Sequence, residues 1–135
     1  MDECGNPFDA ADSILDEVDC KIKLVDFHAE ATAEKASLAY HLDGRVSAVF
    51  GTHTHIQTND VKILSGGTAF ITDLGMTGPA ESVLGVKPEL AVNYMRTGMP
   101  TRFETAPGRC RMDGCIFEID NKTGVCVSAQ AVTVE

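Results

Sequence analysis

Apolar positions follow two patterns along the chain, helical spacing in some segments and short continuous runs in others. Together they predict a layered fold of helices and strands. Apolar residues recur at helical spacing in three segments, 7–19, 32–42 and 88–97. The first of these follows Asn6 and Pro7, which supply a capping side chain and a proline suited to the first turn. We therefore expect three short helices, and no apolar run approaches the length needed to cross a bilayer.

Short apolar runs bounded by turn residues predict the strands. The expected strands are 21–27, 46–50, 63–64, 69–72, 110–120 and 125–134. Ser65-Gly66-Gly67 and Asn121-Lys122-Thr123-Gly124 are tight-turn sequences that should form two hairpins, whereas 74–85 is glycine-rich and is expected to be a loop. This order predicts one domain with an α/β or α+β layered fold and a mixed β-sheet.

Charge and cysteine content limit the partners of this chain. A formal net charge of −9 argues against binding a nucleic-acid duplex, which needs a basic face. Because basic residues are few and scattered, bound metal ions are the natural source of positive charge for a phosphate ligand. The five cysteines form no Cys-x-x-Cys pair, which predicts reduced thiols in a cytoplasmic protein. We expect neither a signal peptide nor a membrane anchor.

Three of the four histidines follow predicted strands. His28 comes after the first strand, and His53 and His55 come after the second. Ligands of layered α/β folds bind at the carboxyl ends of strands, so these side chains should converge on one edge of the sheet. Imidazole binds transition metals well, and the pattern predicts that His28, His53 and His55 are metal ligands. His41 lies near a helix end and is interpreted as an ordinary surface residue.

Other kinds of active site lack their sequence signatures here. No His-Glu-x-x-His pattern supports a metalloprotease, and no Gly-x-Ser-x-Gly pattern supports a serine nucleophile. The paired glycines do not have the spacing of a dinucleotide-binding or phosphate-binding loop. A stand-alone zinc hydrolase with three histidine ligands remains an alternative, and its general base would be Asp26 or Glu30.

Three longer motifs contain or follow the candidate ligands. They are Asp26-Phe27-His28-Ala29-Glu30-Ala31-Thr32-Ala33-Glu34-Lys35, Gly51-Thr52-His53-Thr54-His55-Ile56-Gln57-Thr58 and Ile71-Thr72-Asp73-Leu74-Gly75-Met76-Thr77-Gly78-Pro79. In this order they resemble the YmdB-like metallophosphoesterases, a calcineurin-like family associated with 2′,3′-cyclic-nucleotide 2′-phosphodiesterase activity. The resemblance extends over nearly the whole chain.

The resemblance implies a fold, a cofactor and a reaction. The fold would be part of a calcineurin-like αββα sandwich with a mixed β-sheet. The cofactor would be two divalent metal ions, Fe, Mn or Zn, with His28 and His53 on one ion and His55 on the other. The reaction would be hydrolysis of a small phosphoester or cyclic nucleotide, in which both cations stabilise the charge on the phosphoryl oxygens. The candidates for orienting the rings or contacting the substrate are Asp26, Glu30, Thr52 and Thr54.

The family pattern also includes an N-terminal half that has no counterpart in this sequence. That half carries the remaining metal ligands and the expected general acid, so no catalytic residue is assigned here. We interpret 1–135 as the C-terminal portion of a metallophosphoesterase domain, inactive without the missing half. Absent strands would leave sheet edges and an apolar face uncovered, which predicts self-association as a homo-oligomer. The alternative is a non-catalytic module that binds metal or self-associates.

Overall fold

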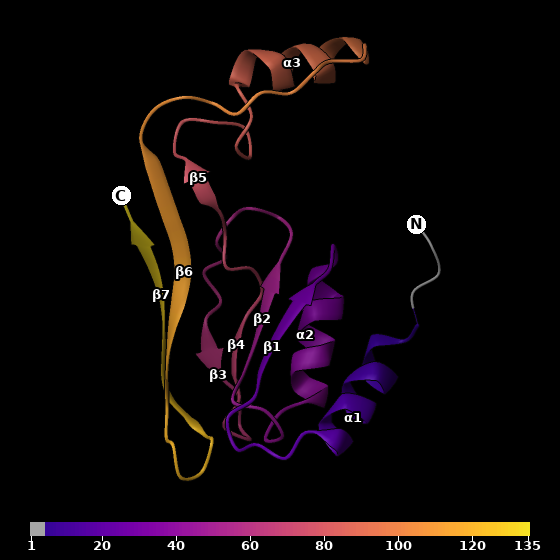
Figure 1. The fold of residues 1–135 in the computed structure, drawn as a ribbon, viewed down its shortest axis with the longest axis vertical. Helices are drawn as coiled ribbons and strands as arrows, with labels where there is room; N and C mark the ends of the chain where they lie inside the picture. The colour runs from indigo at the N-terminus through magenta and orange to yellow at the C-terminus, as the bar shows by residue number, and fades with distance from the viewer. Residues whose placement is uncertain (1–4) are drawn as a thin grey trace.

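In the computed structural model, which describes residues 5–135, two β-sheets pack face to face and two helices cover the outer face of one sheet (Figure 1). The helices are α1 (Pro7–Glu17), α2 (Thr32–His41) and α3 (Pro88–Thr97). The first sheet contains β1 (Leu24–His28), β2 (Ala48–Thr52), β3 (Lys62–Ile63) and β4 (Ala69–Ile71). The second contains β5 (Thr77–Pro79), β6 (Cys110–Ile119) and β7 (Cys126–Val134).

The first sheet is mixed, as the sequence predicts. Its strands lie in the order β1-β2-β4-β3, with β1, β2 and β4 parallel and β3 antiparallel to β4. Parallel strands need a long crossover, and α2 supplies it between β1 and β2. The carboxyl ends of β1 and β2 consequently point to the same end of the molecule, toward β5 and α3 (Figure 1).

Two apolar clusters hold the layers together. Between the helices and the first sheet, Leu38 of α2 and Leu42, which follows that helix, pack with Val49 and Phe70. Between the two sheets, small side chains such as Ala48 let the sheets approach closely. Phe50 of the first sheet stacks on Phe117 of the second, with 6.1 Å between ring centroids. The arrangement is a helix–sheet–sheet stack, which agrees with the predicted α/β fold class.

The structure corrects several predicted boundaries. The predicted loop 74–85 contains β5, which pairs with β6; its sequence Thr-Gly-Pro has no strand pattern of its own. The first two strands begin two or three residues later than predicted and continue through His28 and Thr52. The apolar run ends before these polar residues, whereas strand pairing extends to them. His28 is therefore the last residue of β1.

The described cysteines form no disulfide, and several apolar side chains are exposed. Cys20, Cys110, Cys115 and Cys126 are free, and Cys4 lies outside the described residues. Burial raises the pKa of the Cys126 thiol, which makes it unreactive. Apolar side chains are exposed on edge strand β1 and on the second sheet, with Leu24 at 55% and Ile116 at 60%. Self-association through them stays a prediction.

Within 5–135, no helix combines the length and apolar character of a membrane span.

Candidate metal centre

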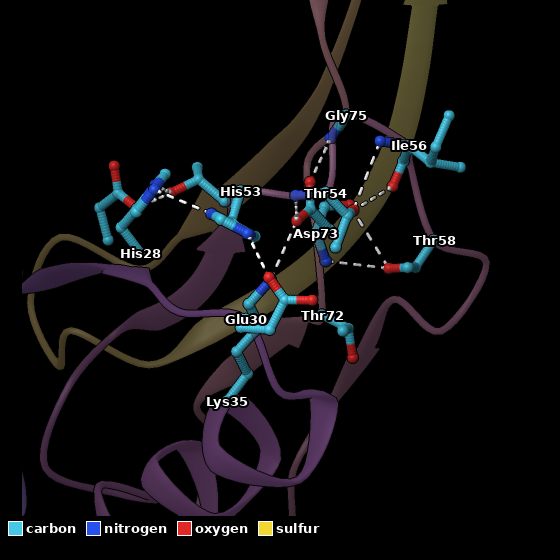
Figure 2. A network of polar contacts seen from close by, with 12 residues as sticks. His28, Glu30, Lys35, His53, Thr54, Ile56, Thr58, Thr72, Asp73 and Gly75 are labelled. Atoms are coloured by element: carbon cyan, nitrogen blue, oxygen red, sulfur yellow. Dashed lines mark hydrogen bonds and ion pairs between the residues drawn. The ribbon is translucent and has the colours of Figure 1, made fainter. Parts of the chain in front are cut away.

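Two of the three candidate histidines meet at the carboxyl ends of β1 and β2. In the register of these strands, His28 is opposite Thr52, so His53 follows at the next position. The two rings lie edge to face at 80°, and their centroids are 5.0 Å apart. His28 Nε2 and His53 Nδ1 approach to 3.2 Å (Figure 2). Parallel pairing of two strands thus brings together two imidazoles that are 25 residues apart in sequence.

The orientation of His28 follows from a chain of hydrogen bonds along the strand ends. The Thr52 hydroxyl donates to Asp26 Oδ1 at 2.9 Å. With its hydrogen used in that bond, the same oxygen lies 3.0 Å from His28 Nδ1 and can only accept from it. In the neutral ring, His28 Nδ1 therefore carries the proton, and the lone pair of Nε2 faces His53. A metal-binding histidine is held in this way when its second nitrogen donates to a neighbouring oxygen.

His53 contacts a histidine ring on one side and a carboxylate on the other. Its Nδ1 faces His28 Nε2, and its Nε2 contacts the Glu30 carboxylate. Glu30 precedes α2, so the start of that helix contributes to the site. Its side chain is largely exposed, whereas His53 is about half covered. The carboxylate is an orienting contact for the ring, and it leaves Nδ1 directed at His28.

His55 and Thr54 occupy different surroundings. His55 lines the same cavity as His28 and His53. Among the described residues, Thr54 makes no hydrogen bond to a histidine ring: its hydroxyl contacts the backbone of Ile56, and its N–H donates to Asp73. The backbone of this segment is unusual, because both His53 (φ 123°) and His55 (φ 64°) have positive φ values.

A cavity of about 610 Å³ opens beside the histidines. The rest of its wall was not foreseen from the sequence, and it consists of residues 75–79, 84–86 and 103–105. Several of these side chains are apolar, including Met76, Leu84 and Phe103. The third long motif, which runs through Gly75 to Pro79, was the available signal for this wall. The cavity is therefore lined by histidines and by several apolar side chains.

The sequence also did not predict a buried ion pair that contacts the segment 53–55. Lys35 Nζ of α2 donates to Asp73 Oδ2 at 2.9 Å, and both side chains are almost fully buried. Burial opposes ionisation of Asp73, but hydrogen bonds from the Thr54 and Gly75 N–H groups and from Lys35 prevail and lower the pKa of its carboxyl. The signal was present in α2, where Lys35 shares the inward helical face with Leu38.

The histidine pair fits a single metal ion in donor chemistry and spacing. Two imidazole nitrogens that bind one ion at about 2.0–2.1 Å each lie roughly 2.9–3.4 Å apart, depending on the angle at the ion. The separation of 3.2 Å between His28 Nε2 and His53 Nδ1 falls in that range. Over residues 5–135, no group of three or more His, Cys, Asp or Glu side chains is arranged to hold a metal ion. These two nitrogens are therefore a partial donor set.

Replacing Thr52 with valine should remove the hydrogen bond that fixes the tautomer of His28. Valine has nearly the same shape but cannot accept from Nδ1, and one hydrogen bond contributes roughly 0.5–1.5 kcal/mol. We expect the neutral ring to change from one tautomer to a mixture, which nitrogen-15 NMR of the imidazole measures. Thr101→Val, on the segment after α3, is the control and should leave the His28 signals unchanged. A single unchanged tautomer in the Thr52 variant would contradict the assignment.

Comparison with known proteins gives consistent matches over the length of the chain. A family model described as "YmdB-like protein" matches residues 1–132. A Bacillus subtilis protein named 2′,3′-cyclic-nucleotide 2′-phosphodiesterase is 43% identical over 96% of this chain and 50% of its own length. A Mycoplasma pneumoniae putative phosphatase/phosphodiesterase is 37% identical over 96% of this chain and 46% of its own length. The chain thus spans about half the length of these curated relatives.

Two crystal structures have the same fold. A hypothetical protein from Thermus thermophilus superposes with a TM-score of 0.93 at 40% identity, covering 99% of this chain and 52% of that one. A structure described as a novel phosphatase from Mycoplasma pneumoniae gives a TM-score of 0.92 at 36% identity, covering 98% and 47%.

Proposed function

This chain belongs to the YmdB-like protein family, and from that premise we propose that it forms the histidine-bearing part of a metal-dependent phosphodiesterase. The names of its relatives, a 2′,3′-cyclic-nucleotide phosphodiesterase and a putative phosphatase/phosphodiesterase, support phosphoester hydrolysis as the activity of the complete protein. The remainder of those relatives corresponds to about half of their length, and we propose that the missing ligands come from there.

The observation that carries the proposal is the approach of His28 Nε2 to His53 Nδ1. Two neutral imidazole nitrogens gain little from facing each other unless a proton or a cation lies between them. The Thr52 hydroxyl keeps the proton of His28 on the far nitrogen, so the near lone pair is available to a cation. A shared divalent ion would satisfy both rings, as the proposal requires.

We propose a separate role for each candidate residue of this chain. His28 and His53 would hold one ion, and His55 would hold the second from the same cavity. Glu30 and the Asp26–Thr52 pair would orient the rings, which raises the affinity of a metal site. When bound, divalent ions polarise a phosphoryl oxygen and stabilise its developing charge. They would also supply the positive charge that a chain of net charge −9 lacks.

We propose a small phosphoester, such as a cyclic nucleotide, as the substrate. The cavity of about 610 Å³ is of the size that binds small organic ligands. Its histidines would face the phosphate, and its apolar side chains, such as Met76 and Phe103, would face the organic part. Iron, manganese and zinc all bind imidazole sites, and any of them would suit the donor set.

Reconstitution tests this function. The chain is assayed alone and after mixing with the separately expressed N-terminal half of the Bacillus subtilis relative. We expect no turnover of bis(p-nitrophenyl) phosphate and at most one metal per chain alone. The mixture should contain about two metals and show turnover that a chelator removes.

Each other outcome has a definite meaning. Turnover by the chain alone would show that residues 1–135 complete the site, which contradicts the assignment of missing ligands. A folded chain that is inactive both alone and in the mixture would contradict the phosphodiesterase function. That result would favour the non-catalytic module that binds metal or self-associates.

A further inference from the structure

We propose that the buried Lys35–Asp73 ion pair positions the segment His53–His55 and thereby sets the directions of its histidine side chains. Both members of the pair are positioning residues rather than ligands. The inference rests on the proposed function for what the histidines bind, whereas the loop geometry can be tested without metal.

The segment needs an external support because its backbone is strained. His53 and His55 both have positive φ values, which residues with a side chain seldom adopt. Such conformations persist only where the surrounding structure enforces them. Thr54 lies between the two histidines, and its N–H donates to Asp73 Oδ2 at 2.9 Å (Figure 2). This bond fixes the backbone at the point between the two strained residues.

The Asp73 carboxylate is itself held rigidly. Its Oδ2 accepts from Lys35 as well as from Thr54, and its Oδ1 accepts from the Gly75 N–H at 3.0 Å. Gly75 begins the cavity wall at 75–79. One buried carboxylate is therefore bonded both to the histidine segment and to the cavity wall at 75–79.

Lys35 connects this carboxylate to the rest of the fold. The residue comes from α2, and its side chain passes so close to Gly51 that a Cβ there would lie 2.7 Å from Lys35 Cδ. A buried ion pair contributes little to stability when compared with an apolar replacement, so stability alone does not explain this pair. A positioning role does explain it. The Asp73 carboxylate can accept hydrogen bonds from the N–H groups of Thr54 and Gly75, while Lys35 neutralises its charge.

The double variant Lys35→Met/Asp73→Asn tests the proposal. It removes both charges together and keeps the approximate shapes, so no uncompensated charge is left in the interior. We expect a folded chain in which hydrogen exchange of the Thr54 amide is at least about tenfold faster. Its affinity for Zn²⁺, measured by calorimetry, should fall about 10- to 100-fold, the usual effect of losing a supporting contact in a metal site.

Asp43→Asn is the matched control. The Asp43 carboxylate also accepts two backbone hydrogen bonds, from Gly66 at 2.8 Å and from Thr68 at 3.3 Å, but it does so in the β3–β4 turn. That turn lies at the other end of the first sheet from the histidines (Figure 1). The control variant should lower thermal stability yet leave Thr54 exchange and Zn²⁺ affinity unchanged.

The two proposals fail in different ways. Wild-type Thr54 protection and Zn²⁺ affinity in the double variant would overturn the positioning role. Absence of bound metal and of turnover in the reconstituted mixture would instead overturn the proposed function, while the exchange experiment would still report on the loop. If the double variant does not fold, Asp73→Glu is used, because it keeps both charges but moves the carboxylate away from its place between Thr54 and Gly75; unchanged Thr54 exchange there would overturn the proposal equally.

Discussion

His53→Ala should abolish metal binding by this chain and activity of the reconstituted protein together. His53 Nδ1 supplies one of the two nitrogens that approach to 3.2 Å, and no third donor is clustered with them in the described residues. Loss of one donor leaves His28 alone, so the affinity for Zn²⁺ should fall by more than the roughly 10- to 100-fold that a supporting contact contributes. Calorimetry on the chain and turnover after mixing measure the two effects.

His41→Ala is the matched control for that experiment. His41 has a similar exposure to His53 and also contacts a carboxylate, Asp12, at 2.9 Å. It lies where α2 faces α1, away from the cavity. This variant should bind Zn²⁺ and complement activity like the wild type. Retained metal and turnover in the His53 variant would remove His53 from the site.

Gly51→Ala should destabilise the fold more than any other single methyl addition in the first sheet. A Cβ at this position would lie 1.8 Å from the Thr72 carbonyl oxygen and 2.7 Å from Lys35 Cδ. The first contact is with backbone, so β2 and the segment after β4 must separate. We expect the free energy of unfolding to fall by about 3 kcal/mol or more, at the upper end of overpacking effects. Urea denaturation followed by circular dichroism measures it.

Gly114→Ala provides the comparison for the glycine experiment. Gly114 also lies in a strand, β6, but a Cβ there would meet no atom within 4 Å. Its unfolding free energy should stay within about 0.5 kcal/mol of the wild type. Equal stability of both variants would show that the Thr72 carbonyl can move aside at little cost, which contradicts the close packing described here.

The parts of the fold that local residues determine were predicted well. Helix α3 has the predicted bounds because Pro88 begins it and Gly98 ends it, with φ at 66°. Strand β5 was missed because its partner β6 determines it. The sequence therefore predicts elements with their own start and stop signals, and it fails where pairing with a distant segment decides the conformation.

The same distinction between local and long-range features applies to the candidate site. The approach of His28 to His53 could be foreseen, because side chains at the carboxyl ends of neighbouring parallel strands lie close together, and both strands were predicted. For the Lys35–Asp73 pair, the sequence places Lys35 on the inward face of α2 but does not identify Asp73, 38 positions away, as its partner. The roles of His55 and Thr54 stay predictions, since the contacts of this chain do not test them.

The parallel register of β1 and β2 has a consequence for folding fidelity. Side chains alternate between the faces of a strand, so a slip by one residue would turn His28 to the other face and break its contacts with Thr52 and His53. An ion that binds both histidines would therefore stabilise only the correctly paired strands. By mass action, such an ion would stabilise the native alignment of the two strands relative to slipped alignments.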